Sequence, residues 1–83
     1  MRLISQEGKI DVSYEMGSLT VSGGMITYYD YSCQKGTAMA IYHSEQKAMK
    51  VMQLIQNQYL DFCCNYHAQS GVFRFPKDSE VEV

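Results

Sequence analysis

The sequence predicts an α+β fold in which an antiparallel β-meander of about four to five strands is covered by one long helix. In the first half, short apolar and Tyr-rich segments alternate with turn residues such as Gly8 and Gly23, a pattern typical of strands joined by hairpins. Residues 44–66 instead repeat apolar side chains every three or four positions, which is typical of an amphipathic helix. A chain of 83 residues is expected to form a single domain, residues 1–83.

The strands are expected in the following order. Residues 1–5 form a short strand, residues 6–9 turn around Gly8, and residues 10–14 form a second extended piece. In residues 18–22, the alternation of Leu19 and Val21 with polar residues predicts a strand with one apolar side.

Gly23 and Gly24 are expected to supply the positive φ angles of a two-residue hairpin turn. Residues 25–32 and 37–42 then form two further strands around a turn at residues 33–36. If Ser32 pairs with Thr37, alternation groups the side chains into two faces. The face that looks like a core carries Leu19, Val21, Ile26, Tyr28, Met39 and Ile41, whereas Cys33, Tyr29, Tyr31, Ala38 and Ala40 share the other.

The helix is expected to begin after Ser44, because serine caps the unpaired N–H groups of a first helical turn. Residues 69–71 end it, and residues 72–75 form an edge strand stopped by Pro76. The acidic tail, residues 78–83, is interpreted as a solvated edge. One stripe of the helix is expected to pack on the sheet: Ala48, Val51, Met52, Ile55, Tyr59, Phe62, Cys63 and Tyr66.

A metal site is the chemistry that the sequence suggests most strongly. A helix that runs back along the sheet brings Cys63, Cys64 and His67 toward the turn that holds Cys33. The i,i+4 and i,i+3 spacings to His67 place thiol and imidazole groups on neighbouring helix positions. We therefore predict a structural zinc of the Cys₃His type.

Other arrangements of these side chains remain open. Adjacent Cys63 and Cys64 point about 100° apart on a regular helix. A Cys₂His site completed by water, by Asp30 or Asp61, or by a neighbouring chain is therefore a second interpretation, and it leaves a homo-oligomer open. In the third interpretation no metal binds, and Cys63 is an ordinary buried thiol. A catalytic cysteine–histidine pair is disfavoured because a helix C-terminus raises a thiol pKa, so no enzymatic activity is expected.

Charge and hydropathy exclude some functions. The net charge is −2, which argues against a protein that binds free nucleic acid by neutralising phosphates. The sequence has no apolar run of about 18 residues that would predict a membrane-spanning helix, and its first residues turn polar too early for a signal peptide. We expect a cytoplasmic protein.

A set of segments spread over the whole chain comprises residues 1–6, Gly8, residues 10–12 and 14–15, the helix entry 44–48, and the ending 73–83. Together these segments resemble small accessory proteins encoded by phages and mobile elements of Gram-positive bacteria. The sequence departs from the resemblance at Ser13, where a proline is expected. Some proteins of this origin inhibit CRISPR–Cas9, and the resemblance places this chain as a candidate for that class.

The resemblance implies a non-enzymatic inhibitor that binds a host protein, with a type II CRISPR–Cas9 nuclease as the partner. The expected contact surface is the sheet face that the helix leaves open, with Tyr28, Tyr29 and Tyr31 as anchors because tyrosine is enriched at interfaces. The alternative is a small phage regulator that associates with nucleic acid by stacking bases on the same tyrosines.

Overall fold

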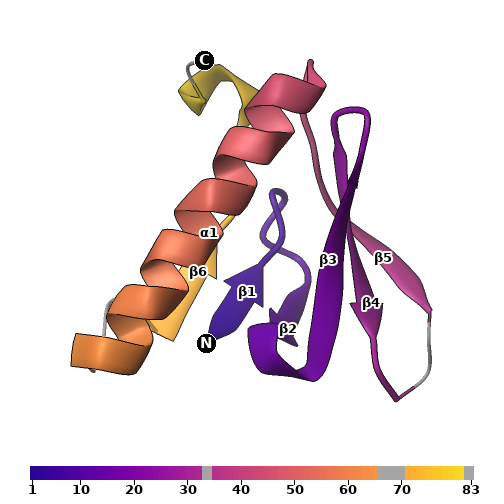
Figure 1. Cartoon of the computed structure of the whole chain (residues 1–83). Coiled ribbons are helices and arrows are strands. Elements are labelled where there is room, and N and C mark those ends of the chain that lie inside the picture. The colour runs from indigo at the N-terminus through magenta and orange to yellow at the C-terminus, as the bar shows by residue number, and fades with distance from the viewer. Residues whose placement is uncertain (33–34, 66–70, 82–83) are drawn as a thin grey trace.

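The computed structural model describes residues 1–32, 35–65 and 71–81, and Figure 1 shows their arrangement. It confirms the α+β class, with six strands rather than four or five. The helix α1 (Glu45–Asn65) lies along one side of the molecule. In chain order the strands are β1 (Arg2–Ile4), β2 (Asp11–Ser13), β3 (Gly17–Ser22), β4 (Met25–Asp30), β5 (Gly36–Ile41) and β6 (Val72–Arg74).

The strands form two sheets instead of one. β3, β4 and β5 make the predicted antiparallel meander. The second sheet has the order β2–β1–β6, in which β1 runs antiparallel to β2 and parallel to β6. A parallel pair needs a long crossover between its strands. Here the crossover in the sequence contains all the elements from β2 to α1, and it returns the last strand, β6, to the sheet that holds β1.

The hairpin between β3 and β4 uses its two glycines differently from the prediction. Gly23 has a positive φ of 60°, which a two-residue hairpin turn requires at its first position. Gly24 does not have a positive φ. Its backbone lies so close to the carbonyl of Tyr42 that a Cβ atom would collide with it, and its oxygen accepts a hydrogen bond of 2.7 Å from the Tyr42 N–H. Gly24 therefore permits close packing of two chain segments.

The pairing of Ser32 with Thr37, considered above as a condition, does not form, because Thr37 pairs with Tyr28 and Gly36 pairs with Tyr29. β4 ends at Asp30, whose carboxylate Oδ1 accepts hydrogen bonds from the backbone N–H and hydroxyl of Ser32, at 2.7 and 2.6 Å. An Asp side chain that captures the N–H two residues later forms an Asx turn, which stops the strand.

A β-bulge in β5 changes which residues reach the core. Ile26 pairs with Ala40 and Thr27 with Ala38, so Met39 is an extra residue. Met39 and Ala40 are both buried. The alternation then shifts by one position, and Ile41, expected on the core face, is 64% exposed.

The helix begins where the sequence predicts. The Ser44 hydroxyl accepts a hydrogen bond of 3.3 Å from the Lys47 N–H, which caps the first turn. Most of the predicted stripe is confirmed, with Ala48, Val51 and Ile55 buried and Met52, Tyr59 and Phe62 partly buried. Cys63 is exposed, so its place in the stripe is wrong, and Tyr66 lies outside the described residues.

One core holds the two sheets and the helix together. Burying a large aliphatic side chain contributes about 1.5–3 kcal/mol, so this cluster is the main source of stability. Its hydrophobic members are Met1, Leu3, Ile26, Tyr28, Met39, Ala40, Tyr42, Ala48, Val51, Ile55, Phe73, Phe75 and Val81.

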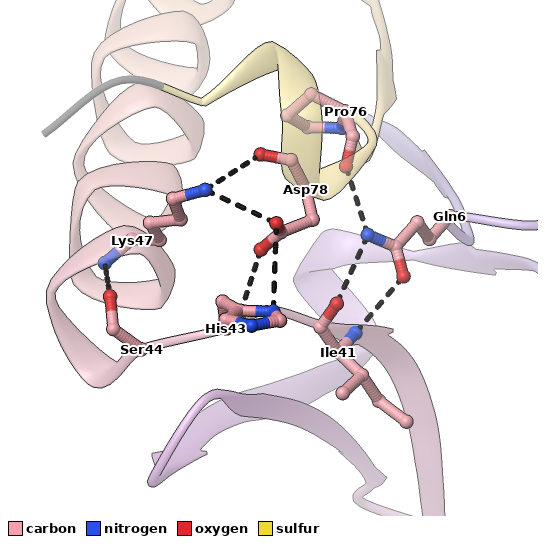
Figure 2. Close-up of polar contacts among 7 residues, drawn as sticks. All are labelled: Gln6, Ile41, His43, Ser44, Lys47, Pro76 and Asp78. Atoms are coloured by element: carbon pink, nitrogen blue, oxygen red, sulfur yellow. Dashed lines mark hydrogen bonds and ion pairs between the residues drawn. The ribbon is translucent and has the colours of Figure 1, made fainter.

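The C-terminal segment packs against the start of α1, which corrects its interpretation as a solvated edge. Asp78 begins a 3-10 turn, and its Oδ1 accepts a hydrogen bond of 2.6 Å from the His43 N–H (Figure 2). The Lys47 ammonium donates to the carbonyl and to Oδ2 of Asp78, both at 3.1 Å. The His43 hydrogen bond, together with Lys47, lowers the pKa of the Asp78 carboxyl. Val81, at the end of the turn, is buried.

Gln6 joins three segments near the same place (Figure 2). Its backbone N–H donates to the Met39 carbonyl at 2.8 Å. Its side-chain amide accepts from the Ile41 N–H at 3.1 Å and donates to the carbonyls of Ile41 and Pro76, both at 3.2 Å. The amide thus satisfies both backbone groups of Ile41 at the edge of β5.

Candidate interaction surface

The sheet β3–β4–β5 has one face toward the core and one that we call the outer face. Cross-strand partners share a face, so its residues follow from the pairing register. Tyr29 is 41% and Ile41 64% exposed, and Met25 is exposed as well. The outer face consists of Ser18, Thr20, Ser22, Met25, Thr27, Tyr29, Gly36, Ala38 and Ile41.

None of these nine residues carries a charge. Charged side chains usually cover solvent-facing surfaces, and the centres of protein interfaces are depleted of charge and enriched in Tyr and Met. The outer face combines Tyr29, Met25 and Ile41 with the small side chains of serine and threonine residues. This composition suits contact with another protein.

The structure separates the three predicted tyrosine anchors. Tyr28 lies in the core at 2% exposure, and its hydroxyl donates a hydrogen bond of 2.7 Å to the Ser13 carbonyl. Its side chain is therefore inaccessible to a partner in this structure. Tyr29 lies on the outer face, and Tyr31, just beyond β4, is 67% exposed. Strand alternation alone separates Tyr28 from Tyr29.

Sequence reasoning missed Ile41 as a surface residue. The alternation of β5 assigns it to the core, and only the bulge at Met39 reverses that assignment. Two consecutive small or flexible residues, Ala38 and Met39, are compatible with a bulge but do not predict one.

The metal prediction concerns residues that are only partly described. Cys63 and Cys64 are exposed free thiols near the end of α1, while Cys33 and His67 lie outside the described residues. Within residues 1–32, 35–65 and 71–81, no three Cys, His, Asp or Glu side chains gather to hold a metal ion. Asp30, one of the carboxylates considered as a further ligand, accepts hydrogen bonds from Ser32.

Cys63 has a polar neighbour one helical turn earlier. A hydrogen bond with the Cys63 side chain, with desolvation adding to it, raises the pKa of the Tyr59 hydroxyl. The Tyr59 ring also packs against Tyr14, with centroids 4.7 Å apart and a tilt of 51°. The exposed thiol of Cys63 therefore adjoins an aromatic pair, Tyr59 and Tyr14, that links α1 to the segment before β3.

That cluster forms part of a groove between α1 and β3, with a volume of about 440 Å³. Glu15 also lines the groove, and its carboxylate accepts hydrogen bonds from the amino group of Met1 at 2.7 and 2.8 Å. Desolvation by itself would raise the pKa of Glu15, but this amino group outweighs it and the pKa is lowered. The volume falls within the ~300–1,000 Å³ typical of ligand sites. The other lining residues are Gly17, Ser18, Leu19, Tyr31, Met52, Ile55 and Gln56.

No family model, curated protein or solved structure matches this chain. Among the described residues, no helix combines the length and the apolar character needed to cross a membrane.

Proposed function

We propose that this protein is a non-enzymatic, phage-encoded inhibitor that binds a host protein in the bacterial cytoplasm through its outer face. The observation that carries the proposal is the uncharged composition of that face, with Tyr29, Met25 and Ile41 exposed. The resemblance to phage accessory proteins supplies the partner, a type II CRISPR–Cas9 nuclease. Bound there, the chain blocks the nuclease from using its guide or target DNA.

The same face disfavours the alternative of a nucleic-acid regulator. Proteins that bind single strands combine stacking aromatics with a positively charged groove. The outer face offers Tyr29 for stacking but contributes no Lys or Arg. Protein contact therefore agrees better with its chemistry.

A pull-down with purified Cas9, a DNA-cleavage assay and an electrophoretic shift on free DNA test the proposal together. We expect co-purification with Cas9, slower cleavage of target DNA and no shift of DNA alone. The matched variants are Ile41→Lys, which places a charge on the outer face, and Leu54→Lys, which changes an exposed residue of α1. Binding that survives Ile41→Lys, or DNA binding without Cas9, would refute the proposal.

We further propose that Cys33, Cys63, Cys64 and His67 hold a structural zinc that fastens the β4–β5 turn to the end of α1. The exposure of Cys63 and Cys64 leaves both thiols accessible to an ion. Elemental analysis of protein prepared without a metal-binding tag is expected to find zinc, and chelation is expected to lower the melting temperature. Less than about 0.2 equivalents of zinc, or unchanged melting, would refute this site.

A further inference from the structure

The two edge strands of the sheet β3–β4–β5 differ in whether their outward backbone groups have hydrogen-bond partners. An exposed edge strand presents unpaired N–H and C=O groups, which natural proteins usually protect with charges, proline or a covering segment. At β5 the side-chain amide of Gln6 occupies both backbone groups of Ile41. β3, at the opposite edge, contains no charged residue and no proline, and among the described residues it pairs with no strand other than β4.

The hairpin geometry identifies the unpaired groups of β3. In a two-residue hairpin the residues that flank the turn, here Ser22 and Met25, exchange hydrogen bonds, and every second residue then repeats this arrangement. The bond from the Tyr31 N–H to the Met16 carbonyl continues the same pattern. The backbone groups of Leu19 and Val21 therefore point away from β4.

No hydrogen bond joins these outward groups of Leu19 and Val21 to another residue in the described part of the chain. Because buried unpaired backbone groups are rare and costly, these groups are expected to face water. The free edge adjoins the groove beside α1, which Leu19 lines together with Met52 and Tyr59.

We infer that the β3 edge and this groove form a binding site for an extended peptide segment of a partner protein. The segment adds to β3 as a further strand and hydrogen-bonds to Leu19 and Val21, the mode known as β-strand addition. Its residue opposite Leu19 has its side chain on the same face as that of Leu19, so a long apolar side chain enters the groove. Glu15 is the one charged side chain that lines the groove, and its carboxylate is already paired with the amino group of Met1, so the groove favours an apolar side chain over a charged one.

A peptide fits this edge better than a second copy of the chain. Two-fold pairing of β3 with another β3 puts both copies of α1 on the same face of the joined sheet. Adjacent strands lie only about 4.8 Å apart, whereas a helix with its side chains is about 10 Å wide. A second copy would bring its own α1 to the groove that α1 already bounds, whereas a peptide segment brings no helix.

Apart from Ser18, which lines the groove and also lies on the outer face, this site is separate from the outer face and does not depend on the identity of the partner. The probe is a library of random twelve-residue peptides displayed on phage, selected against the whole protein. We expect enrichment of peptides with a long apolar residue. On binding the synthesised peptide, the amides of Leu19 and Val21, fast to exchange in the free protein, become protected.

The matched variants are Leu19→Pro and Leu19→Ala. Both remove the leucine side chain, but only proline removes the outward N–H, at an edge position that tolerates it. We expect Leu19→Pro to bind at least about tenfold more weakly than Leu19→Ala, with folding checked by circular dichroism. Amide exchange needs no variant, so it decides the question if Leu19→Pro does not fold.

Three results would overturn the inference. The first is no enrichment over an unrelated immobilised protein. The second is slow exchange of the Leu19 and Val21 amides in the free monomer. The third is a concentration-dependent dimer that protects those amides, which would mean that the edge pairs with a second copy. Failure to bind Cas9 changes none of these outcomes.

Discussion

Replacing Gln6 with alanine tests how the two sheets are held together. The side chain makes three hydrogen bonds that bridge the turn after β1, the edge of β5 and the C-terminal segment. Each such bond contributes about 0.5–1.5 kcal/mol net. Because Gln6 is partly exposed, values near the lower end apply, and Gln6→Ala is expected to lower the free energy of unfolding by about 1.5–3 kcal/mol.

Thermal and urea unfolding measure this effect. For a domain of this size, 1 kcal/mol shifts the melting temperature by about 4–8 °C, so a loss of roughly 10 °C is expected. Glu7→Ala is the control, because Glu7 is exposed and makes no hydrogen bond with another described residue. If Gln6→Ala and Glu7→Ala differ by less than about 0.5 kcal/mol, Gln6 does not join the sheets as described.

Three further substitutions test the core, the tail and the start of β3. Ile55 is 1% exposed, and Ile55→Ala is expected to lower the free energy of unfolding, measured in urea, by about 2–5 kcal/mol. Leu54 is 44% exposed, and Leu54→Ala should change it by less than about 0.5 kcal/mol. Equal losses would contradict the orientation of α1. The pKa of Asp78 is lowered by folding, so its stabilising contribution is present above the ordinary carboxyl range and is lost as the pH falls through the lowered value. Asp78→Asn should therefore flatten the loss of stability below about pH 5, and an unchanged pH profile of unfolding would contradict this. In Gly17→Ala the added Cβ would collide with the Tyr28 ring and the Tyr29 carbonyl. Thermal unfolding should therefore show a free energy of unfolding lower by about 1–3 kcal/mol, and wild-type stability would contradict the close approach of these residues.

The helix and most of the meander were predictable from the sequence because local signals determine them. Ser44 caps the helix as serine does at many helix starts, and the apolar spacing from Ala48 to Ile55 selects the buried side. The alternation around Ile26 and Tyr28 likewise identifies the core face of β4. Each of these features depends on residues within a few positions of one another.

The remaining features depend on contacts between distant segments. The parallel pairing of β6 with β1 joins the two ends of the chain, and neither strand alone indicates its partner. The bulge that exposes Ile41 arises where Gln6 meets Met39 and Ile41. Asp78 looked like part of a solvated tail because His43, its hydrogen-bond partner, lies 35 residues away.

The candidate site was predicted only in outline. An open sheet face with exposed tyrosines was expected, and Tyr29 lies on such a face. Its apolar residue Ile41 was not identified, because its exposure depends on the bulge in the pairing of β4 with β5. The zinc ligands Cys33 and His67 lie outside the described residues, so the metal site stays a prediction.

The affinity of the protein for Cas9, measured by titration calorimetry, tests the central claim most directly. Wild-type protein is expected to bind, Leu54→Lys to bind equally well, and Ile41→Lys to lose at least about 2 kcal/mol, or roughly thirtyfold in affinity, as expected for a central interface residue. All three proteins should unfold at similar temperatures. Equal binding by Ile41→Lys and wild type, or no binding by the wild type, would contradict a role of the outer face in binding Cas9.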